Sequence, residues 1–283
     1  MKAELLVSTE ALAAHLDDPD WIVFDTRHDL AYPEKGWKAW QAAHIPGAYF
    51  MHMDEDLSGA KTGKNGRHPL PDLADFAFRM NRCGVAPGRQ VVVYDDGGAS
   101  FAVRLWWMLR WLGHDRVAVL DGGFAAWKRE GRPLDAIVPA PREGKFVPAP
   151  TKGATVDAQY VAASLGNPAV HLIDARAATR FMGENETLDP VAGHIPGSHN
   201  RFWQHNLGYD GRFLAPEELH AEFLEVLGDA DPALVVHSCG SGVTACHNLF
   251  AMELAGLGGS RLYPGSWSEW CSDPSRPVAT GPK

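Results

Sequence analysis

Cys239 stands in the run His237-Ser-Cys-Gly-Ser-Gly-Val-Thr-Ala245, directly after four apolar residues at 233–236. The apolar run predicts a short buried strand, the two glycines allow a tight turn, and residues 243–255 repeat apolar side chains at helical spacing. The first N–H groups of a helix have no partner within it, so they can converge on a sulfur placed before it. Such N–H groups and the helix dipole favour the thiolate, which is the nucleophilic form of cysteine. The spacing therefore predicts covalent catalysis by Cys239.

Two other roles are open to this cysteine. Unpaired cysteines are often buried and inert, although the glycines after Cys239 let backbone amides face its sulfur. Cys246 and His247 are residue types that bind metals, but their spacing is not a Cys-x-x-Cys pair and no second close pair follows. We therefore expect neither a metal nor any other cofactor.

A cysteine phosphatase also places its nucleophile in a loop before a helix. Those enzymes hold phosphate with an arginine that follows the cysteine after five intervening residues. That position is Ala245 here, and no arginine occurs between Cys239 and Leu257. A phosphate dianion would lack its two-point clamp, so the sequence disfavours a phosphatase.

Length, charge and cysteine usage limit the function further. The chain has 283 residues, 45% of them hydrophobic, which is enough for two domains with real cores. A net charge of −9 argues against a nucleic-acid or acidic-membrane partner. No apolar run approaches the ~18 residues of a membrane helix, and the first ten residues carry acids where a secretory signal is apolar. We expect a cytoplasmic protein without disulfides, because its cysteines are few and unpatterned: Cys83, Cys239, Cys246 and Cys271.

An internal repeat predicts two similar domains. Five short blocks recur in the same order in both halves, and the last two blocks keep the same spacing in each half. The first copy has Asp96 at the position that Cys239 holds in the second. The paired blocks are residues 6–15 and 154–163, 21–27 and 170–176, 44–48 and 194–198, 91–96 and 234–239, and 120–127 and 263–270.

A proline-rich stretch separates the two copies. Residues 131–151 contain five prolines, which block helix and strand interiors and favour a stiff, extended connection. Within each copy, short apolar strands alternate with helical stretches such as 104–112, a pattern typical of a parallel sheet covered by helices. The predicted fold is therefore α/β, with domains at 1–135 and 152–283, a linker at 136–151, and in each domain a parallel sheet with helices on both faces.

Four motifs resemble those of the rhodanese-type sulfurtransferases in their tandem two-domain form, and the resemblance covers nearly the whole chain. The cysteine loop is the most specific and is similar to the loop of the 3-mercaptopyruvate sulfurtransferases. Thiosulfate-preferring members usually carry basic residues where this chain has Gly240 and Ser241. The four motifs are His44-Ile-Pro-Gly-Ala48, His194-Ile-Pro-Gly-Ser198, Cys239-Gly-Ser-Gly-Val-Thr-Ala245 and Tyr263-Pro-Gly-Ser-Trp-Ser-Glu-Trp270.

The resemblance implies sulfur transfer in two steps. The Cys239 thiolate takes a sulfane sulfur from 3-mercaptopyruvate or thiosulfate, and a thiol, a thioredoxin-like protein or cyanide then discharges the persulfide. Backbone N–H groups suit both anions. A carboxylate cannot carry sulfur in this way, so Asp96 marks the first domain as inactive and the second as catalytic. The alternative is a non-enzymatic persulfide carrier for a partner protein, and in either case we expect a monomer or a weak oligomer.

The resemblance also assigns roles to individual residues. Asp54, His68 and Ser241 match residues proposed to relay a proton, in which the carboxylate orients the imidazole and the imidazole handles the serine proton. Arg180 matches the arginine that binds the donor, since a planar guanidinium can grip a carboxylate at two points. The remaining residues expected to bind the substrate are those of the cysteine loop: Gly240, Gly242, Val243 and Thr244.

The chain departs from the family pattern at two positions. The mercaptopyruvate enzymes usually have a second arginine nine residues after the first, where this chain has Asp189. An acid there is expected to repel a carboxylate donor, which leaves the preferred donor open, and Arg201 is a candidate substitute. Pro264 stands where aspartate is commoner, but proline removes only one N–H donor, so we expect little effect.

His44 and His194 each precede Ile-Pro-Gly, a turn sequence at the start of a strand. The motif occurs in both copies, including the copy that lacks the cysteine. We therefore predict that both are hydrogen-bonded structural histidines, because a catalytic histidine needs one specific geometry.

Overall fold

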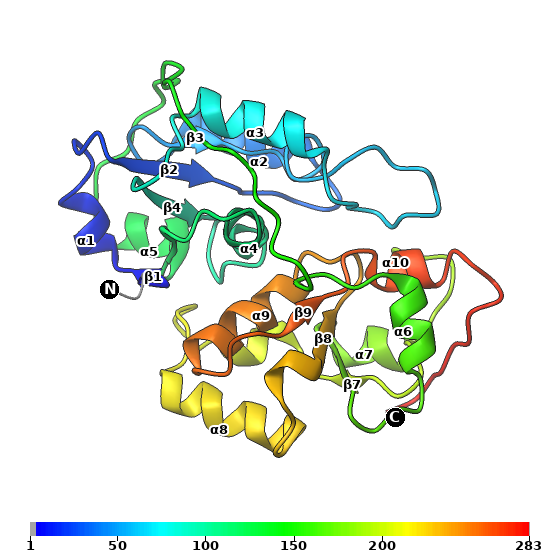
Figure 1. Cartoon of the computed structure of the whole chain (residues 1–283). Helices are drawn as coiled ribbons and strands as arrows, with labels where there is room; N and C mark the ends of the chain where they lie inside the picture. The colour runs from blue at the N-terminus through cyan, green and yellow to red at the C-terminus, as the bar shows by residue number, and fades with distance from the viewer. Residues whose placement is uncertain (1–3, 283) are drawn as a thin grey trace. The chain divides into compact units, whose positions relative to one another are not determined.

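The structure is a computed structural model that describes residues 4–282. It divides into two compact units, which the colours of Figure 1 help to trace along the chain. The first unit comprises the residues up to Gly59 together with Leu70–Thr151 and Tyr209–Phe213. The second unit comprises Ala60–Pro69, Lys152–Gly208 and the residues from Leu214 onwards.

A parallel sheet of five strands, in the order β1-β5-β4-β2-β3, forms the centre of the first unit. Parallel neighbours need crossover connections, and helices supply them. The strands are β1 (Leu6–Val7), β2 (Trp21–Asp25), β3 (Tyr49–Phe50), β4 (Gln90–Tyr94) and β5 (Val117–Leu120). The helices are α1 (Thr9–Ala13), α2 (Glu34–Ala42), α3 (Leu73–Arg82), α4 (Ala102–Trp111) and α5 (Gly123–Arg129).

The second unit repeats this plan with a parallel sheet of four strands in the order β7-β6-β8-β9. Its strands are β6 (His171–Asp174), β7 (His199–Asn200), β8 (Val235–Ser238) and β9 (Arg261–Leu262). Its helices are α6 (Ala158–Ser164), α7 (Ala178–Met182), α8 (Pro216–Leu227), α9 (Ala245–Leu254) and α10 (Ser266–Trp270), with short 3-10 turns at Trp203–Asn206 and Pro232–Leu234. The two sheets confirm the predicted α/β fold with helices on both faces. Over residues 4–282, no helix is both long and apolar enough to cross a membrane.

A buried Asp-x-Arg pair ends the same strand in both units. In the first, the guanidinium of Arg27 binds the carboxylate of Asp25 and donates to the Ala43 carbonyl at 2.7 Å. In the second, Arg176 binds Asp174 and donates to the Gly193 carbonyl at 2.8 Å. Each arginine therefore ties a strand end to the segment that leads into His-Ile-Pro-Gly, because a buried charge needs both a counter-ion and hydrogen bonds.

The two histidines of that turn have the structural role that the repeat predicts. Both side chains are fully buried. His44 places Nδ1 2.7 Å from the carbonyl of Trp40, and His194 places Nδ1 2.8 Å from the carbonyl of Phe181. These backbone hydrogen bonds and stacking on the Trp40 and Phe181 rings fix the turns, so the prediction is confirmed.

The compact units differ from the predicted domain boundaries. Residues 60–69 lie before the proline-rich stretch but belong to the second unit, and residues 209–213 lie after it but belong to the first. The stretch at 136–151 does not stand apart as a linker. It belongs to the first unit, where the N–H of Lys145 donates to Val85 and that of Ala149 donates to Leu112. Proline removes only its own N–H, so the residues between the prolines still bond to the unit.

The buried histidine of β8 makes the stability of the second unit depend on pH. Burial lowers the pKa of His237 from its usual value of 6.5 to about 3. Between these two values the unfolded chain binds more protons than the folded chain, so the free energy of unfolding falls as the pH falls. One such group contributes a slope of about 1.4 kcal/mol per pH unit.

Replacing this histidine by an apolar residue should remove that slope. Hydrogen exchange of the β8 and β6 amides, measured between pH 6.5 and pH 4.5, reports the opening free energy of this unit. We expect the opening free energy of His237→Leu to decrease less on acidification than that of the wild type. Equal slopes in the two proteins would contradict the burial argument, whatever the absolute stability of the variant.

Candidate active site

The carboxyl end of β8 carries the predicted nucleophile. This strand lies between β6 and β9, and Cys239 follows its last residue, Ser238. The strand begins at Val235 and the helix after the loop begins at Ala245, each two residues later than the apolar pattern alone predicts. Open α/β sheets form their sites beyond the carboxyl ends of their strands, and Cys239 has that position.

Two backbone N–H groups face the sulfur of Cys239. The N–H of Ser241 donates to Sγ at 3.4 Å and the N–H of Gly242 donates to it at 3.2 Å. The backbone of the cysteine is itself held, because its N–H donates to Ser266 Oγ at 3.1 Å and its carbonyl accepts the N–H of Trp267. Because Cys239 is only 2% exposed, these fixed dipoles take the place of water around its sulfur.

The backbone of Gly242 makes this loop conformation accessible. Its φ is +76°, a left-handed value that favours glycine. A Cβ at this position would collide with the carbonyl oxygen of Pro264 and lie 3.0 Å from its carbonyl carbon and Cα. The backbone of Pro264 therefore packs directly on the cysteine loop, and this contact does not need the N–H that proline lacks.

The corresponding loop of the first unit is occupied by a carboxylate. Asp96 holds the cysteine position and is exposed, whereas its neighbour Asp95 is buried. Burial raises the pKa of Asp95 to about 6, against the lowering effect of its hydrogen bonds. The sequence argument used Asp96 alone and missed Asp95, whose carboxylate accepts the N–H groups of Gly97, Ala99, Phe101 and Ala102.

The predicted partners His68 and Ser241 lie together in the second unit. The ring Nδ1 of His68 is 2.7 Å from Ser241 Oγ, and both side chains are buried. Ser241 also supplies one of the two N–H groups that face Cys239. Its hydroxyl can therefore exchange a proton with an imidazole while its backbone stabilises the sulfur.

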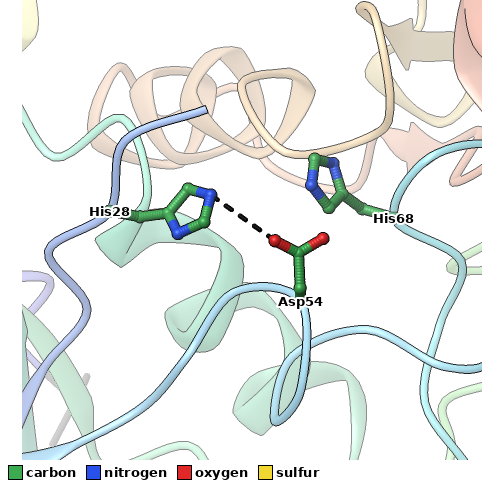
Figure 2. A group of neighbouring side chains, drawn as sticks. All are labelled: His28, Asp54 and His68. Atoms are coloured by element: carbon green, nitrogen blue, oxygen red, sulfur yellow. Dashed lines mark ion pairs between the residues drawn. The ribbon is translucent and has the colours of Figure 1, made fainter. Parts of the chain in front are cut away.

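Asp54, the third predicted relay residue, lies in the first unit. Its carboxylate is 24% exposed and forms an ion pair with His28, with 3.8 Å between Oδ2 and Nε2 (Figure 2). Its backbone N–H donates to Nδ1 of His52 at 3.2 Å. The role expected of Asp54 toward His68 stays a prediction.

The other predicted residues of the cysteine loop, Val243 and Thr244, directly precede α9. The carbonyls of Val243 and Thr244 accept the N–H groups of Cys246 and His247. The two residues weighed as metal ligands have other partners, since Cys246 Sγ donates to the Gly242 carbonyl at 3.4 Å and His247 Nδ1 lies 3.0 Å from an asparagine amide. The binding roles expected of Val243 and Thr244 stay predictions.

Arg180 is held by two carboxylates. Its guanidinium binds Glu186 at 2.9 Å and Asp189 at 3.3 Å. Burial raises the pKa of Glu186, but the N–H of Leu188 and the guanidinium of Arg180 outweigh it and leave that pKa below its usual value. The repulsion expected from Asp189 ignored this pairing, because Asp189 is an ion-pair partner of the arginine.

Arg201, the candidate substitute for the second arginine, is 6% exposed and has its own partners. Its guanidinium binds Glu222 and donates to Asn206 Oδ1 at 3.1 Å. Burial lowers the pKa of Arg201, and Glu222 opposes that effect. The sequence analysis did not consider Arg67, which binds Asp189 and lies directly before the predicted catalytic His68.

Comparison with known proteins decides the family. The model of the rhodanese-like domain matches residues 8–130 and again residues 157–273. The chain belongs to the rhodanese family. It is 50% identical to the probable 3-mercaptopyruvate sulfurtransferase of Pseudomonas aeruginosa, over 99% of this chain and 100% of the relative. It is also 36% identical to the putative thiosulfate sulfurtransferase SseB of Mycobacterium tuberculosis, over 99% of this chain and 98% of the relative.

Solved structures of this family have the same two-domain fold. The crystal structure of SseA from Escherichia coli, a 3-mercaptopyruvate sulfotransferase, superposes with a TM-score of 0.82 at 34% identity, covering 94% of this chain and 99% of that one. The chain is therefore a sulfurtransferase, and it is similar to members named for either donor.

The substitution Gly242→Ala tests the cradle around the sulfur. The left-handed backbone alone costs about 1–2 kcal/mol in an alanine, and the collision with Pro264 must also move the loop. Displacing one preorganised donor should lower sulfur transfer about a hundredfold or more. The measurements are the rate of sulfur transfer and the thermal unfolding of the second unit.

Gly197 provides the matched control in the same unit. Its φ is +79°, and a Cβ there would meet nothing within 4 Å. Gly197→Ala should therefore show the conformational cost without loss of transfer. Equal activity in the two variants would refute the claim that close approach of Pro264 shapes the loop.

Proposed function

We propose that this sulfurtransferase carries sulfur as a persulfide on Cys239, taking it from 3-mercaptopyruvate or thiosulfate and passing it to a thiol, a thioredoxin-like protein or cyanide. The observation that carries the proposal is the pair of backbone N–H groups on Cys239 Sγ, at 3.2 and 3.4 Å. Fixed donors of this kind stabilise a thiolate and a persulfide anion alike. All four cysteines are free, which suits a reducing cytoplasm.

In the loading step, the thiolate attacks the sulfur of the donor. With 3-mercaptopyruvate, the S–S bond forms as the carbon–sulfur bond breaks, and its electron pair passes to the carbon as an enolate. The proton of the donor thiol must then reach that carbon to give pyruvate. With thiosulfate, the sulfur–sulfur bond of the donor breaks and sulfite leaves with the electron pair, so no carbon needs a proton.

The discharge step returns the enzyme to its starting form. An acceptor thiolate or cyanide attacks the outer sulfur of the persulfide, and the Cys239 thiolate leaves with the electron pair. The same N–H groups that hold the persulfide stabilise this leaving thiolate. A protein acceptor would use the same persulfide, so the carrier activity that the sequence left open needs no second site.

The contact between His68 and Ser241 supports a proton relay for the carbon donor. The 2.7 Å separation is within hydrogen-bond reach, and burial of both groups keeps bulk water from replacing the relay. In this proposal Ser241 passes the proton between donor sulfur and carbon, His68 exchanges it with the hydroxyl, and Asp54 orients the imidazole.

Mass spectrometry of donor-treated protein tests the nucleophile. The wild type should gain the mass of one sulfur atom, and Cys239→Ser should gain none, because an alcohol oxygen does not form a persulfide. Cys83→Ala is the control: burial raises the pKa of Cys83 to about 12, so its thiol is inert and sulfur loading should persist. A full sulfur adduct on Cys239→Ser would end the proposal.

Comparing two donors tests the relay. Ser241→Ala should lower kcat with 3-mercaptopyruvate about a hundredfold, while turnover of thiosulfate stays within a few-fold, since sulfite leaves without a proton. Ser164, whose hydroxyl donates to the Tyr160 carbonyl in α6, is a control position, and Ser164→Ala should retain both activities. An equal loss with both donors would argue for a purely structural serine.

A further inference from the structure

We propose that Arg67 is the second arm of the donor site, and that Asp189 is the positioning residue that holds Arg67 and Arg180 beside the nucleophile. The inference rests on the proposed function. It goes further by naming what binds the anionic end of the donor and by reversing the role expected of Asp189.

The carboxylate of Asp189 lies between two guanidinium groups. Its Oδ1 binds Nη1 of Arg67, and its Oδ2 lies 3.3 Å from Nη2 of Arg180. The Asp189 side chain is 2% exposed, whereas the arginine side chains are 27% and 21% exposed. The acid is thus withdrawn behind the two cations, which remain open to an incoming anion.

The remaining ends of both guanidiniums lie against the cysteine loop. A Cβ placed on Gly240 would be 2.7 Å from Nη2 of Arg67 and 3.6 Å from Nη1 of Arg180. Gly240 directly follows Cys239. A donor whose sulfur meets Sγ therefore has N–H groups of two arginines within reach of its charged end, and a carboxylate is the group that such forks bind best.

The backbone of Arg67 is anchored to the same loop. Its N–H donates to Ser268 Oγ at 3.0 Å, and the N–H of Ser268 donates to the carbonyl of Gly240 at 2.9 Å. Gly66, with φ +84°, packs on the backbone of Gly265 so closely that a Cβ would lie 2.9 Å from its carbonyl oxygen. Ser268 therefore links the Arg67 backbone to the loop that follows the nucleophile.

The balance between arginines and carboxylates in this cluster indicates how the arginines would bind a donor. Glu186 binds Nε and Nη2 of Arg180 and also binds Arg176, which pairs with Asp174. Three arginines thus alternate with three carboxylates, so the cluster has no excess positive charge. It would hold a donor through directed N–H groups, whose geometry depends on the carboxylates behind them.

The substitution Asp189→Asn distinguishes repulsion of the donor from positioning of the arginines, because the two roles predict opposite changes in KM for 3-mercaptopyruvate. If Asp189 only repels anions, removing its charge lowers KM for 3-mercaptopyruvate. If it positions the arginines, KM rises about tenfold, because the asparagine amide cannot bind two guanidiniums and the forks lose their alignment. Asp273→Asn adds the same charge to the same unit at an exposed ion pair with Arg276 and should leave KM unchanged.

Two substitutions of Arg67 test its role in donor binding. The rate of persulfide discharge, which should not change, is the internal control. Arg67→Ala should raise KM about tenfold or more, and Arg67→Lys should recover only part of the loss, because a lysine keeps the charge without the fork. Discharge of preloaded persulfide by cyanide should stay within about twofold of the wild-type rate, since the donor has already left. The double variant with Asp189→Asn should raise KM less than the product of the single effects.

The outcomes distinguish failure of this inference from failure of the proposed function. If the wild type gains no sulfur from the donor, the proposed function is wrong. A wild type that loads sulfur, with unchanged KM in Arg67→Ala or with unchanged or lowered KM in Asp189→Asn, overturns the inference alone. Thermal unfolding of each variant shows that the fold is retained, and Arg67→Lys keeps the test valid if the alanine variant unfolds.

Discussion

Backbone N–H groups that converge beyond the end of a parallel strand are the interaction on which the proposed chemistry of this protein depends. The turn that follows such a strand leaves N–H groups without a backbone acceptor, and a buried donor must find one. In the first unit the carboxylate of Asp95 accepts four of them. In the second unit the sulfur of Cys239 accepts two. The buried N–H groups therefore find their acceptor in the Asp95 carboxylate in one copy and in the Cys239 sulfur in the other.

Buried charge in the second unit is arranged in alternating pairs that begin at the strand end. Asp174 closes β6 and binds Arg176, Arg176 and Arg180 share Glu186, and Arg180 contacts Asp189. Each charge is compensated where water is excluded, which is the condition for keeping it ionised. The acids near Arg180 are therefore its ion-pair partners, and in the proposed donor site they hold its guanidinium in place.

Periodicity and repetition predicted most of the fold, because strands and helices are local and their apolar patterns are visible along the chain. Cys239 was equally visible, since a nucleophile at a strand-to-helix turn needs only neighbours in sequence. Contacts between distant segments were not visible in the sequence. The segment 60–69 lies in the first half of the chain, but its contacts group it with the second compact unit, where His68 meets Ser241. The ion pair of Arg201 with Glu222 was equally hidden.

The sequence by itself determined the α/β class, the two copies, and which copy has a cysteine at the end of its strand, because these follow from residue type and short spacing. Only the tertiary structure decided which charges surround Asp189. Its effect depends on charges within a few ångströms, since the Coulomb energy falls with distance in space and is indifferent to separation along the chain. Arg67, which neutralises it, is 122 residues away in sequence. Folding brings the two together, so an acid that reads as an isolated repulsive charge in the sequence is paired with two arginines.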